Sequence, residues 1–370
     1  MKILVASDSF KGTMSSREIG RIVQQELAPI HQVDFLSVSD GGEGLLDSLQ
    51  ELFPGQICRA RSQDPLGREI TSPYIFSVDH TAIIESANTV GLELLAAHEQ
   101  NPMNASSYGL GLLLGDALSR GAERIYIGLG GSAVNDGGVG MLRAMGVKMF
   151  DGNGDEIRED GGKVMGRVSA MDTTALDSRI QAVAFYAVCD VDNPLLGSRG
   201  AARVYGPQKG ADPVMLEALE MGMTSLAEVV KKLTGHDSSA EPGAGAAGGL
   251  GFCLKSFFHA RLMKGMDALA DWTGLENQIM QYDLIITGEG KLDHQTESGK
   301  VPLGMLRLGE KHHIPVLCLC GLNESMRDMG FKKVFSIVPR YASLSESKAS
   351  PEFYLRKLIR DEVISWINHQ

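Results

Sequence analysis

Short apolar runs at the two ends of the chain predict the strands of one parallel sheet. Near the start, residues 3–6 and 33–38 form two such runs, and residues 16–27 between them read as a helix with Ser15 or Ser16 and Glu18 suited to its entry. Near the end, three more runs are separated by segments long enough for crossover helices, at residues 283–287, 315–320 and 334–338. Strands this short and apolar are typical of a parallel sheet covered on both faces.

The middle of the chain carries its own strand and helix patterns. Apolar runs at residues 81–85, 124–128 and 183–189 predict further strands, and residues 214–233 predict a long helix. A chain of 370 residues suits two domains of common size. We therefore expect an α/β protein in which residues 1–60 and 282–370 form a discontinuous flavodoxin-like domain with one parallel sheet. A second α/β domain, residues 61–281, is inserted into it.

Composition and charge exclude several classes of protein. The net charge of −11 and the lack of a clustered basic tract argue against a nucleic-acid partner. No run of about 18 apolar residues occurs, and the N-terminus turns polar at Asp8, too early for a signal peptide. We therefore expect a cytoplasmic protein that is not bound to a membrane. The five cysteines are scattered without a CxxC pair, which favours reduced, buried thiols over a metal site.

Glycine is the most informative residue type. Many of the 44 glycines gather in five polar clusters, at residues 40–44, 128–140, 206–210, 242–251 and 287–293. Glycine lets backbone N–H groups approach an anion closely, as a phosphate-binding loop requires. One such cluster alone is more often a turn, but five that also carry carboxylates, lysines or hydroxyls favour a polyphosphate site.

Two familiar nucleotide-binding motifs were weighed against this pattern. The Walker A motif matches nowhere, which excludes an ordinary P-loop kinase. Gly128, Gly130 and Ala133 follow a predicted strand with the spacing of a dinucleotide fingerprint, and Asp151 lies at the distance of a ribose-binding acid. Residues 135–138 (NDGG) interrupt the helix that such a fingerprint must open. A nicotinamide-dependent oxidoreductase is therefore the lesser alternative.

The order of the polar motifs resembles that of type-I glycerate kinases over roughly residues 1–338. The matching segments are DSFK (8–11), DGGEG (40–44), GSAVNDGG (131–138), CDVDNPL (189–195), YGPQKG (205–210), PGAGAAGG (242–249), TGEG (287–290) with Asp293, and GKVP (299–302). The resemblance implies ATP, Mg²⁺ and D-glycerate, with ADP and 2-phosphoglycerate as products. It leaves phosphorylation at the 3-hydroxyl and a non-catalytic nucleotide or sugar-acid sensor as alternatives. The partners expected are these small molecules and, in a homodimer, a second copy of the chain.

The chain departs from the family pattern in two places. Ser7 stands where a proline usually precedes Asp8. In residues 104–112, Ala105 and Leu112 remove polar groups that the family normally has. This stretch either lines the acceptor pocket or serves packing, and we favour packing.

Phosphoryl transfer requires a proton acceptor and cations around the transferred group. Asp190 follows a predicted strand and precedes Asn193 and Pro194, so we expect it at the carboxyl edge of the sheet as general base, with a turn-capping role as the alternative. Lys11 and Lys209 are expected to neutralise phosphate oxygens, and Arg203 to bind phosphate or the substrate carboxylate; each has a plain surface charge as its alternative.

The remaining candidates are grouped by the ligand that they are expected to bind. The acceptor is assigned Asp8, Ser9, Asn135, Asp136 and Arg203. Mg²⁺ is assigned Asp40, Glu43 and Asp293, since hard cations prefer carboxylate oxygens. The nucleotide is assigned Gly243, Gly245, Gly248, Gly249, Gly288, Glu289 and Gly290. For the run 242–251, close helix packing through small residues is an equal alternative to an anion seat at a helix N-terminus.

Overall fold

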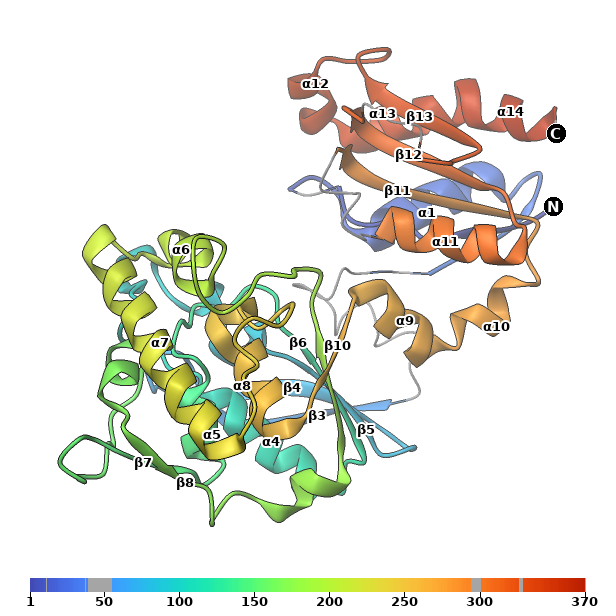
Figure 1. The fold of residues 1–370 in the computed structure, drawn as a ribbon. Helices are drawn as coiled ribbons and strands as arrows, with labels where there is room; N and C mark the ends of the chain where they lie inside the picture. The colour runs from blue at the N-terminus through green and yellow to red at the C-terminus, as the bar shows by residue number, and fades with distance from the viewer. Residues whose placement is uncertain (11, 37, 39–54, 294–300, 326–328, 370) are drawn as a thin grey trace. The chain divides into compact units, whose positions relative to one another are not determined.

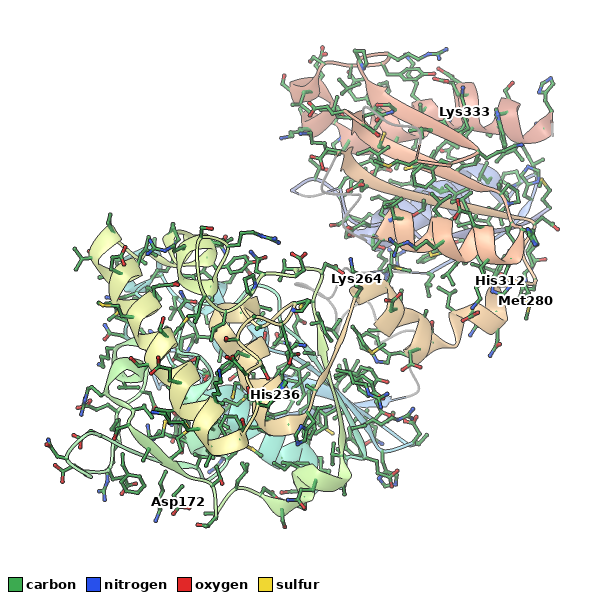
Figure 2. The ribbon with its side chains drawn as sticks, in the orientation of Figure 1. Asp172, His236, Lys264, Met280, His312 and Lys333 are labelled. Atoms are coloured by element: carbon green, nitrogen blue, oxygen red, sulfur yellow. The ribbon has the colours of Figure 1, made fainter. Side chains whose placement is uncertain are left out.

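The computed structural model describes residues 1–369 except 11, 37, 39–54, 294–300 and 326–328. The chain divides into two compact units (Figure 1). The first comprises the described residues up to position 38 and those from Lys264 onward, and the second comprises the described residues 55–263. Lys264, labelled in Figure 2, begins the second segment of the first unit.

This division differs from the expected boundaries at both ends of the insertion. Strand β3 (Gly55–Gln63) belongs to the second unit, although the insertion was expected to begin at residue 61. Helices α9 (Gly265–Thr273) and α10 (Leu275–Ile279) belong to the first unit, although the insertion was expected to run to residue 281. The hydrophobic pattern locates strands and helices but does not say which unit each of them joins.

The first unit contains a parallel sheet of five strands with flavodoxin-like order. Its strands are β1 (Lys2–Val5), β2 (Gln32–Phe35), β11 (Leu284–Leu292), β12 (Val316–Asn323) and β13 (Lys333–Val338). They lie in the order β13-β12-β11-β1-β2, and every neighbouring pair is parallel. This confirms the expected flavodoxin-like fold, and the order reverses between β1 and β11, the point where such sheets bind ligands.

Helices cover both faces of this sheet. They are α1 (Ser16–Leu27), α9, α10, α11 (Val301–His312), α12 (Leu344–Ala349), α13 (Pro351–Leu358), a π-helical turn (Ile359–Val363) and α14 (Ile364–Asn368). The entry of α1 is as expected, because Ser15 and Glu18 form a reciprocal capping box. Ile3 of β1 packs in one core with α1 and α13, whereas Gly309 of α11 faces Ile285 on the opposite face.

The second unit is built on a mixed sheet of six strands. These are β3, β4 (Glu69–Ser77), β5 (Thr81–Glu85), β6 (Arg124–Gly128), β9 (Ala184–Val188) and β10 (Arg261–Met263), in the order β10-β9-β6-β5-β4-β3. Strands β5, β6, β9 and β10 are parallel, and β4 and β3 extend the sheet in antiparallel pairing. The three expected strands are confirmed as β5, β6 and β9. A separate hairpin pairs β7 (Lys148–Phe150) with β8 (Ala170–Asp172).

One large core holds the helices of the second unit on its sheet. The α-helices are α3 (Ala87–Val90), α4 (Tyr108–Ser119), α5 (Val139–Ala144), α6 (Ala201–Tyr205), α7 (Pro213–Thr234) and α8 (Leu250–Phe258). The 3-10 helices are η1 (Leu92–Leu94), η2 (Ala97–Glu99), η3 (Gly162–Arg167), η4 (Ser178–Ala182), η5 (Pro207–Lys209) and η6 (Ala246–Gly249). No helix in the described part of the chain is long and apolar enough to span a membrane.

Candidate functional site

Three parallel strands of the second unit end side by side and bring several predicted residues to one edge. Glu85 at the end of β5 pairs with Gly128 of β6, and Gly128 pairs with Val188 of β9. The residues that follow these strands therefore emerge at the same carboxyl edge of the sheet. They include the turn at residues 132–136 after β6 and Asp190 after β9, so this edge is the candidate site in the second unit.

Lys209 is buried at this edge, with only 2% of its side chain exposed. Its Nζ donates to Ser132 Oγ at 3.1 Å and to the carbonyl oxygen of Val134 at 2.6 Å. Among the described residues, no carboxylate oxygen lies within the 4.0 Å ion-pair distance of the ammonium. Burial lowers the pKa of Lys209 to about 7, and the nearby charge of Asp136 acts in the opposite direction. Lys209 therefore loses its proton more easily than an ordinary lysine, and two of the three N–H bonds of its ammonium have an acceptor among the described residues.

Asn135 adds a second buried polar group to this turn. Its side chain is fully buried, and neither its Oδ1 nor its Nδ2 has a hydrogen-bond partner among the described residues. Buried amides in native proteins are rarely left unpaired, so such a group is a candidate for ligand or water contact. This is consistent with the predicted role of Asn135 in binding the acceptor.

Asp136 is also fully buried, but its carboxylate is already engaged within the protein. Its Oδ2 accepts from Ser107 N and Ser107 Oγ, both at 2.8 Å, and from Gly140 N at 3.3 Å. Its Oδ1 accepts from Gly138 N at 3.0 Å. Burial raises the pKa of the Asp136 carboxyl, and these hydrogen bonds oppose that shift. The carboxylate thus accepts hydrogen bonds from the N-terminal ends of both α4 and α5, where the helix dipole favours a negative charge.

The glycine run 242–251 packs closely on this turn. Gly248, at φ 69°, accepts through its carbonyl oxygen from Gly137 N at 3.0 Å. A Cβ at Gly248 would lie 2.0 Å from the Val134 carbonyl oxygen, and one at Gly249 would lie 2.8 Å from Gly137 Cα. Close backbone approach therefore explains glycine at these two positions, and helix α8 begins directly after them.

The other two nucleotide candidates of this run also have packing reasons. A Cβ at Gly243 would lie 2.8 Å from the Leu262 methyl carbons, and one at Gly245 would lie 2.3 Å from the Pro194 carbonyl oxygen. The packing alternative thus describes all four glycines, and nucleotide binding by them stays a prediction.

Asp190 and Arg203 have different surroundings. Asp190 is partly buried in the turn that follows β9. Arg203 on α6 is exposed, and its Nη2 donates to Glu217 Oε1 on α7 at 3.0 Å. Asp190 therefore lies at the same edge of the sheet as the 132–136 turn, whereas Arg203 forms an ion pair at the surface.

In the first unit, the predicted residues gather where the strand order reverses. Asp8 follows β1, its N–H donates to the Gly288 carbonyl oxygen at 2.8 Å, and its Oδ1 accepts from Ser9 N at 2.7 Å. Gly288, Glu289 and Gly290 lie inside β11 rather than in a loop. A Cβ at Gly288 would lie 2.2 Å from the Leu319 carbonyl oxygen of β12, so strand pairing requires glycine there.

The candidate cation ligands are only partly described. Asp40, Glu43 and the phosphate-binding candidate Lys11 lie outside the described residues. Asp293 follows β11, with its Oδ2 3.3 Å from Lys291 Nζ. Within the described ranges, no group of three or more His, Cys, Asp or Glu side chains could hold a metal ion.

His236, labelled in Figure 2, follows α7 and does not belong to the candidate residues at the edge of either sheet. His236 Nε2 lies 2.8 Å from Glu241 Oε1 in an exposed pair, and Glu241 also pairs with Lys255. This surface cluster is separate from the candidate residues.

Sequence reasoning missed three serines and a glutamate of the second unit. Ser132 Oγ accepts a hydrogen bond from the Lys209 ammonium, and Ser107 donates to the Asp136 carboxylate. The buried Ser86 hydroxyl has no hydrogen-bond partner among the described residues. Glu85 is buried at the end of β5. Glu85 and Ser86 could have been found, because they end and follow a correctly predicted strand. Nothing in the local pattern marks Ser107.

Comparison with known proteins gives one consistent result over the whole chain. A family model described as the glycerate kinase family matches residues 3–367. The glycerate 2-kinase of Escherichia coli K12 is 39% identical, over 94% of this chain and 93% of its own length. The glycerate kinase of Bacillus subtilis 168 is 37% identical, over 98% and 96%. A crystal structure assigned as glycerate kinase 2 from Salmonella typhimurium LT2 covers 100% of this chain and 99% of its own, with a TM-score of 0.87 and 35% identity.

Proposed function

This chain belongs to the glycerate kinase family, and we propose that it transfers the γ-phosphate of ATP to the 2-hydroxyl of D-glycerate. It is an ATP-dependent glycerate kinase, and the 2-position is favoured by the relative named glycerate 2-kinase. The observation that carries this function is the family match over residues 3–367, with no large segment of the chain left over. Family membership also supports a kinase over the nicotinamide-dependent and sensor alternatives.

In the proposed reaction, Asp190 accepts the proton of the acceptor hydroxyl. The hydroxyl oxygen forms a bond to the γ-phosphorus while the bond from that phosphorus to the β–γ bridging oxygen breaks, and ADP leaves. The position of Asp190 at the end of β9, in the turn beside the buried lysine edge, supports this role. A positioned base of this kind contributes about 10²- to 10⁴-fold in rate.

Lys209 is proposed to hold a substrate oxyanion and stabilise its negative charge. Among the described residues its buried ammonium donates to two neutral oxygen atoms, which supports a role toward a negatively charged ligand. Lys11 is proposed to assist it. Asn135 is proposed as an acceptor ligand, because its buried amide is unpaired among the described residues.

The first unit is proposed to contribute Asp8, Ser9 and residues 288–290. These residues lie at the reversal point of its sheet, where the flavodoxin-like order places ligands. Gly243, Gly245, Gly248 and Gly249 stay predictions for the nucleotide, and Arg203 stays a prediction for the acceptor.

Mg²⁺ is proposed to enter with ATP, where it would neutralise part of the charge on the phosphates. Such ions are commonly held by one or two carboxylates together with substrate phosphates. Asp293 fits that donor type, because it is a carboxylate at the end of β11, and Asp40 and Glu43 stay predictions. The cytoplasm as compartment and a homodimer as assembly also stay predictions, to be checked by fractionation and light scattering.

Phosphorus NMR of the purified protein with ATP, Mg²⁺ and D-glycerate tests this proposal. We expect ADP and 2-phosphoglycerate, and no ADP when D-glycerate is left out or when a chelator removes the cation. Formation of 3-phosphoglycerate would overturn the regiochemistry and keep the kinase. Absence of any glycerate-dependent ADP would overturn the function itself.

A further inference from the structure

Asp136 stands in the same turn as the partners of Lys209, and its carboxylate is engaged by groups of the protein. Its two oxygens already accept four hydrogen bonds from Ser107, Gly138 and Gly140. The side chain is fully buried, and the same turn carries the partners of Lys209. A role in the reaction must therefore act through its neighbours.

We propose that Asp136 is a positioning residue: its negative charge keeps Lys209 protonated, and its hydrogen bonds fasten the 132–136 turn to α4 and α5. The proposal rests on the function of Lys209 proposed above. It differs from the acceptor-binding role that the sequence predicted for Asp136, because the carboxylate would act on Lys209 and on the turn rather than on the substrate itself.

The hydrogen bonds indicate that Asp136 is ionised. All four come from donors, namely three backbone N–H groups and the hydroxyl of Ser107. The Ser107 hydroxyl oxygen also accepts from Met141 N at 2.9 Å. Three backbone N–H groups that point at one carboxyl favour its charged form, which supports an ionised Asp136.

The charges around Lys209 make Asp136 its electrostatic partner. Asp136 is the ionisable group whose charge raises the pKa of Lys209 against the effect of burial. Among the described residues, Cys253 on α8 is a further titratable group close to Asp136, and burial raises the pKa of this thiol, so it stays neutral. Arg203 on the neighbouring α6 pairs with Glu217 instead. Removal of the Asp136 charge should therefore act on Lys209 first.

The expected effect can be stated for the Asp136→Asn variant. Loss of a nearby opposite charge lowers the pKa of a buried lysine by roughly one unit or more. With Lys209 near its midpoint at about pH 7, the protonated fraction at about pH 7.5 would fall about tenfold. The alkaline limb of the kcat/KM profile for D-glycerate should then move to lower pH by at least about one unit, because this profile reports the free enzyme.

Ser107→Ala is the matched control. It removes one hydrogen bond from the same carboxylate and leaves the charge in place. We expect its kcat/KM to fall while its alkaline limb stays where the wild type has it. If the profile of Asp136→Asn superimposes on the wild-type profile after scaling, or if Ser107→Ala shifts the limb equally, the proposal is overturned. Wild-type turnover in the same series tests the proposed function separately.

A second measurement covers the case in which Asp136→Asn does not fold. In wild-type protein with ¹³C-labelled aspartate carboxyls, the Asp136 signal can be identified by its displacement in Ser107→Ala. We expect this signal to shift in one step near pH 7, as Lys209 loses its proton, and to lose the step in Lys209→Met. A signal with no step in the wild type, or with the same step in Lys209→Met, overturns the pairing whether or not the protein phosphorylates glycerate.

Discussion

Replacement of Lys209 by methionine gives a stability change whose sign should depend on pH. Methionine has a similar unbranched shape and fills the same buried space without a charge. Burial lowers the pKa of Lys209 from its ordinary 10.5 to about 7. At about 1.4 kcal/mol per pH unit, the buried ammonium costs about 5 kcal/mol relative to the unfolded chain.

The direction follows from proton binding in the two states. Between about pH 7 and 10.5 the unfolded chain keeps the lysine proton and the folded protein loses it. The free energy of unfolding of the wild type therefore rises with pH across this window. Below about pH 7 both states are protonated, so the full cost is present.

The methionine variant lacks this cost but also lacks two hydrogen bonds. The Val134 carbonyl oxygen and Ser132 lose their donor, which should cost about 1–3 kcal/mol at every pH. Lys209→Met should therefore be more stable than the wild type by about 2–4 kcal/mol at or below pH 7. Near pH 10, where about 1 kcal/mol of the cost of burying the ammonium remains, it should be less stable by about 0–2 kcal/mol.

Urea unfolding at several pH values measures this difference, provided that the signal comes from the second unit. Both tryptophans, Trp272 and Trp366, lie in the first unit, so tryptophan fluorescence would report on the wrong part of the chain. Hydrogen exchange of a peptide that covers β6 reports on the correct sheet. Comparison of the two proteins at the same pH cancels the pH dependence of intrinsic exchange.

Arg203→Met is the control for this series, because it removes a cation from exposed α6, and arginine does not titrate in this range. Its stability difference from the wild type should stay constant with pH. If the curves of wild type and Lys209→Met run parallel from about pH 6.5 to 9.5, Lys209 does not titrate there and the reasoning from burial is refuted.

Three further substitutions, one of them with a matched control, test other parts of the site. Asp190→Asn should lower kcat by about 10²- to 10⁴-fold with little change in ATP affinity measured by calorimetry; a kcat within a few-fold of the wild type contradicts its role as base. Gly248→Ala should lower the free energy of unfolding by more than about 2 kcal/mol, because its Cβ would lie 2.0 Å from the Val134 carbonyl oxygen. Gly235 also has a positive φ of 74°, but a Cβ added there would meet no other heavy atom within 4 Å. Gly235→Ala should therefore lower the free energy of unfolding by only about 1–2 kcal/mol. Equal losses of stability in Gly248→Ala and Gly235→Ala would refute the packing argument. Arg203→Gln should change stability by less than about 1 kcal/mol, since its ion pair is exposed, and an unchanged KM for D-glycerate would remove it from the acceptor site.

The hydrophobic pattern predicted the parallel strands well because they are short, apolar and buried on both faces. Strands β5 and β6 begin and end at the predicted residues, and α1 begins after its predicted cap at Ser15. The antiparallel strands β3 and β4 were missed. β3 (GQICRARSQ) has few apolar residues and carries Arg59 and Arg61, so its pattern does not stand out from a polar loop.

Sequence reasoning found only part of the candidate site, because some of its contacts depend on how distant segments of the chain pack together. Motif resemblance located Lys209, Asn135 and Asp190, whose segments follow predicted strands or glycine turns. It could not say that the Asp136 carboxylate accepts hydrogen bonds from Ser107, because that contact depends on how α4 and α5 pack together. Nor could it say that residues 287–290 continue a strand, since glycine suits both a loop and a close strand pair.

The sequence by itself determined the short parallel strands, helix α1, the two-ended flavodoxin-like sheet and the family to which the chain is similar. These follow from local periodicity, caps and ordered motifs, which are all properties of neighbouring residues. Only the tertiary structure decided the protonation chemistry of the site. Lys209 meets Ser132 and Val134 across 77 and 75 residues of chain, and Asp136 meets Ser107 across 29. The burial that lowers the pKa of Lys209 and the donors that hold Asp136 come from long-range packing, which no local pattern encodes.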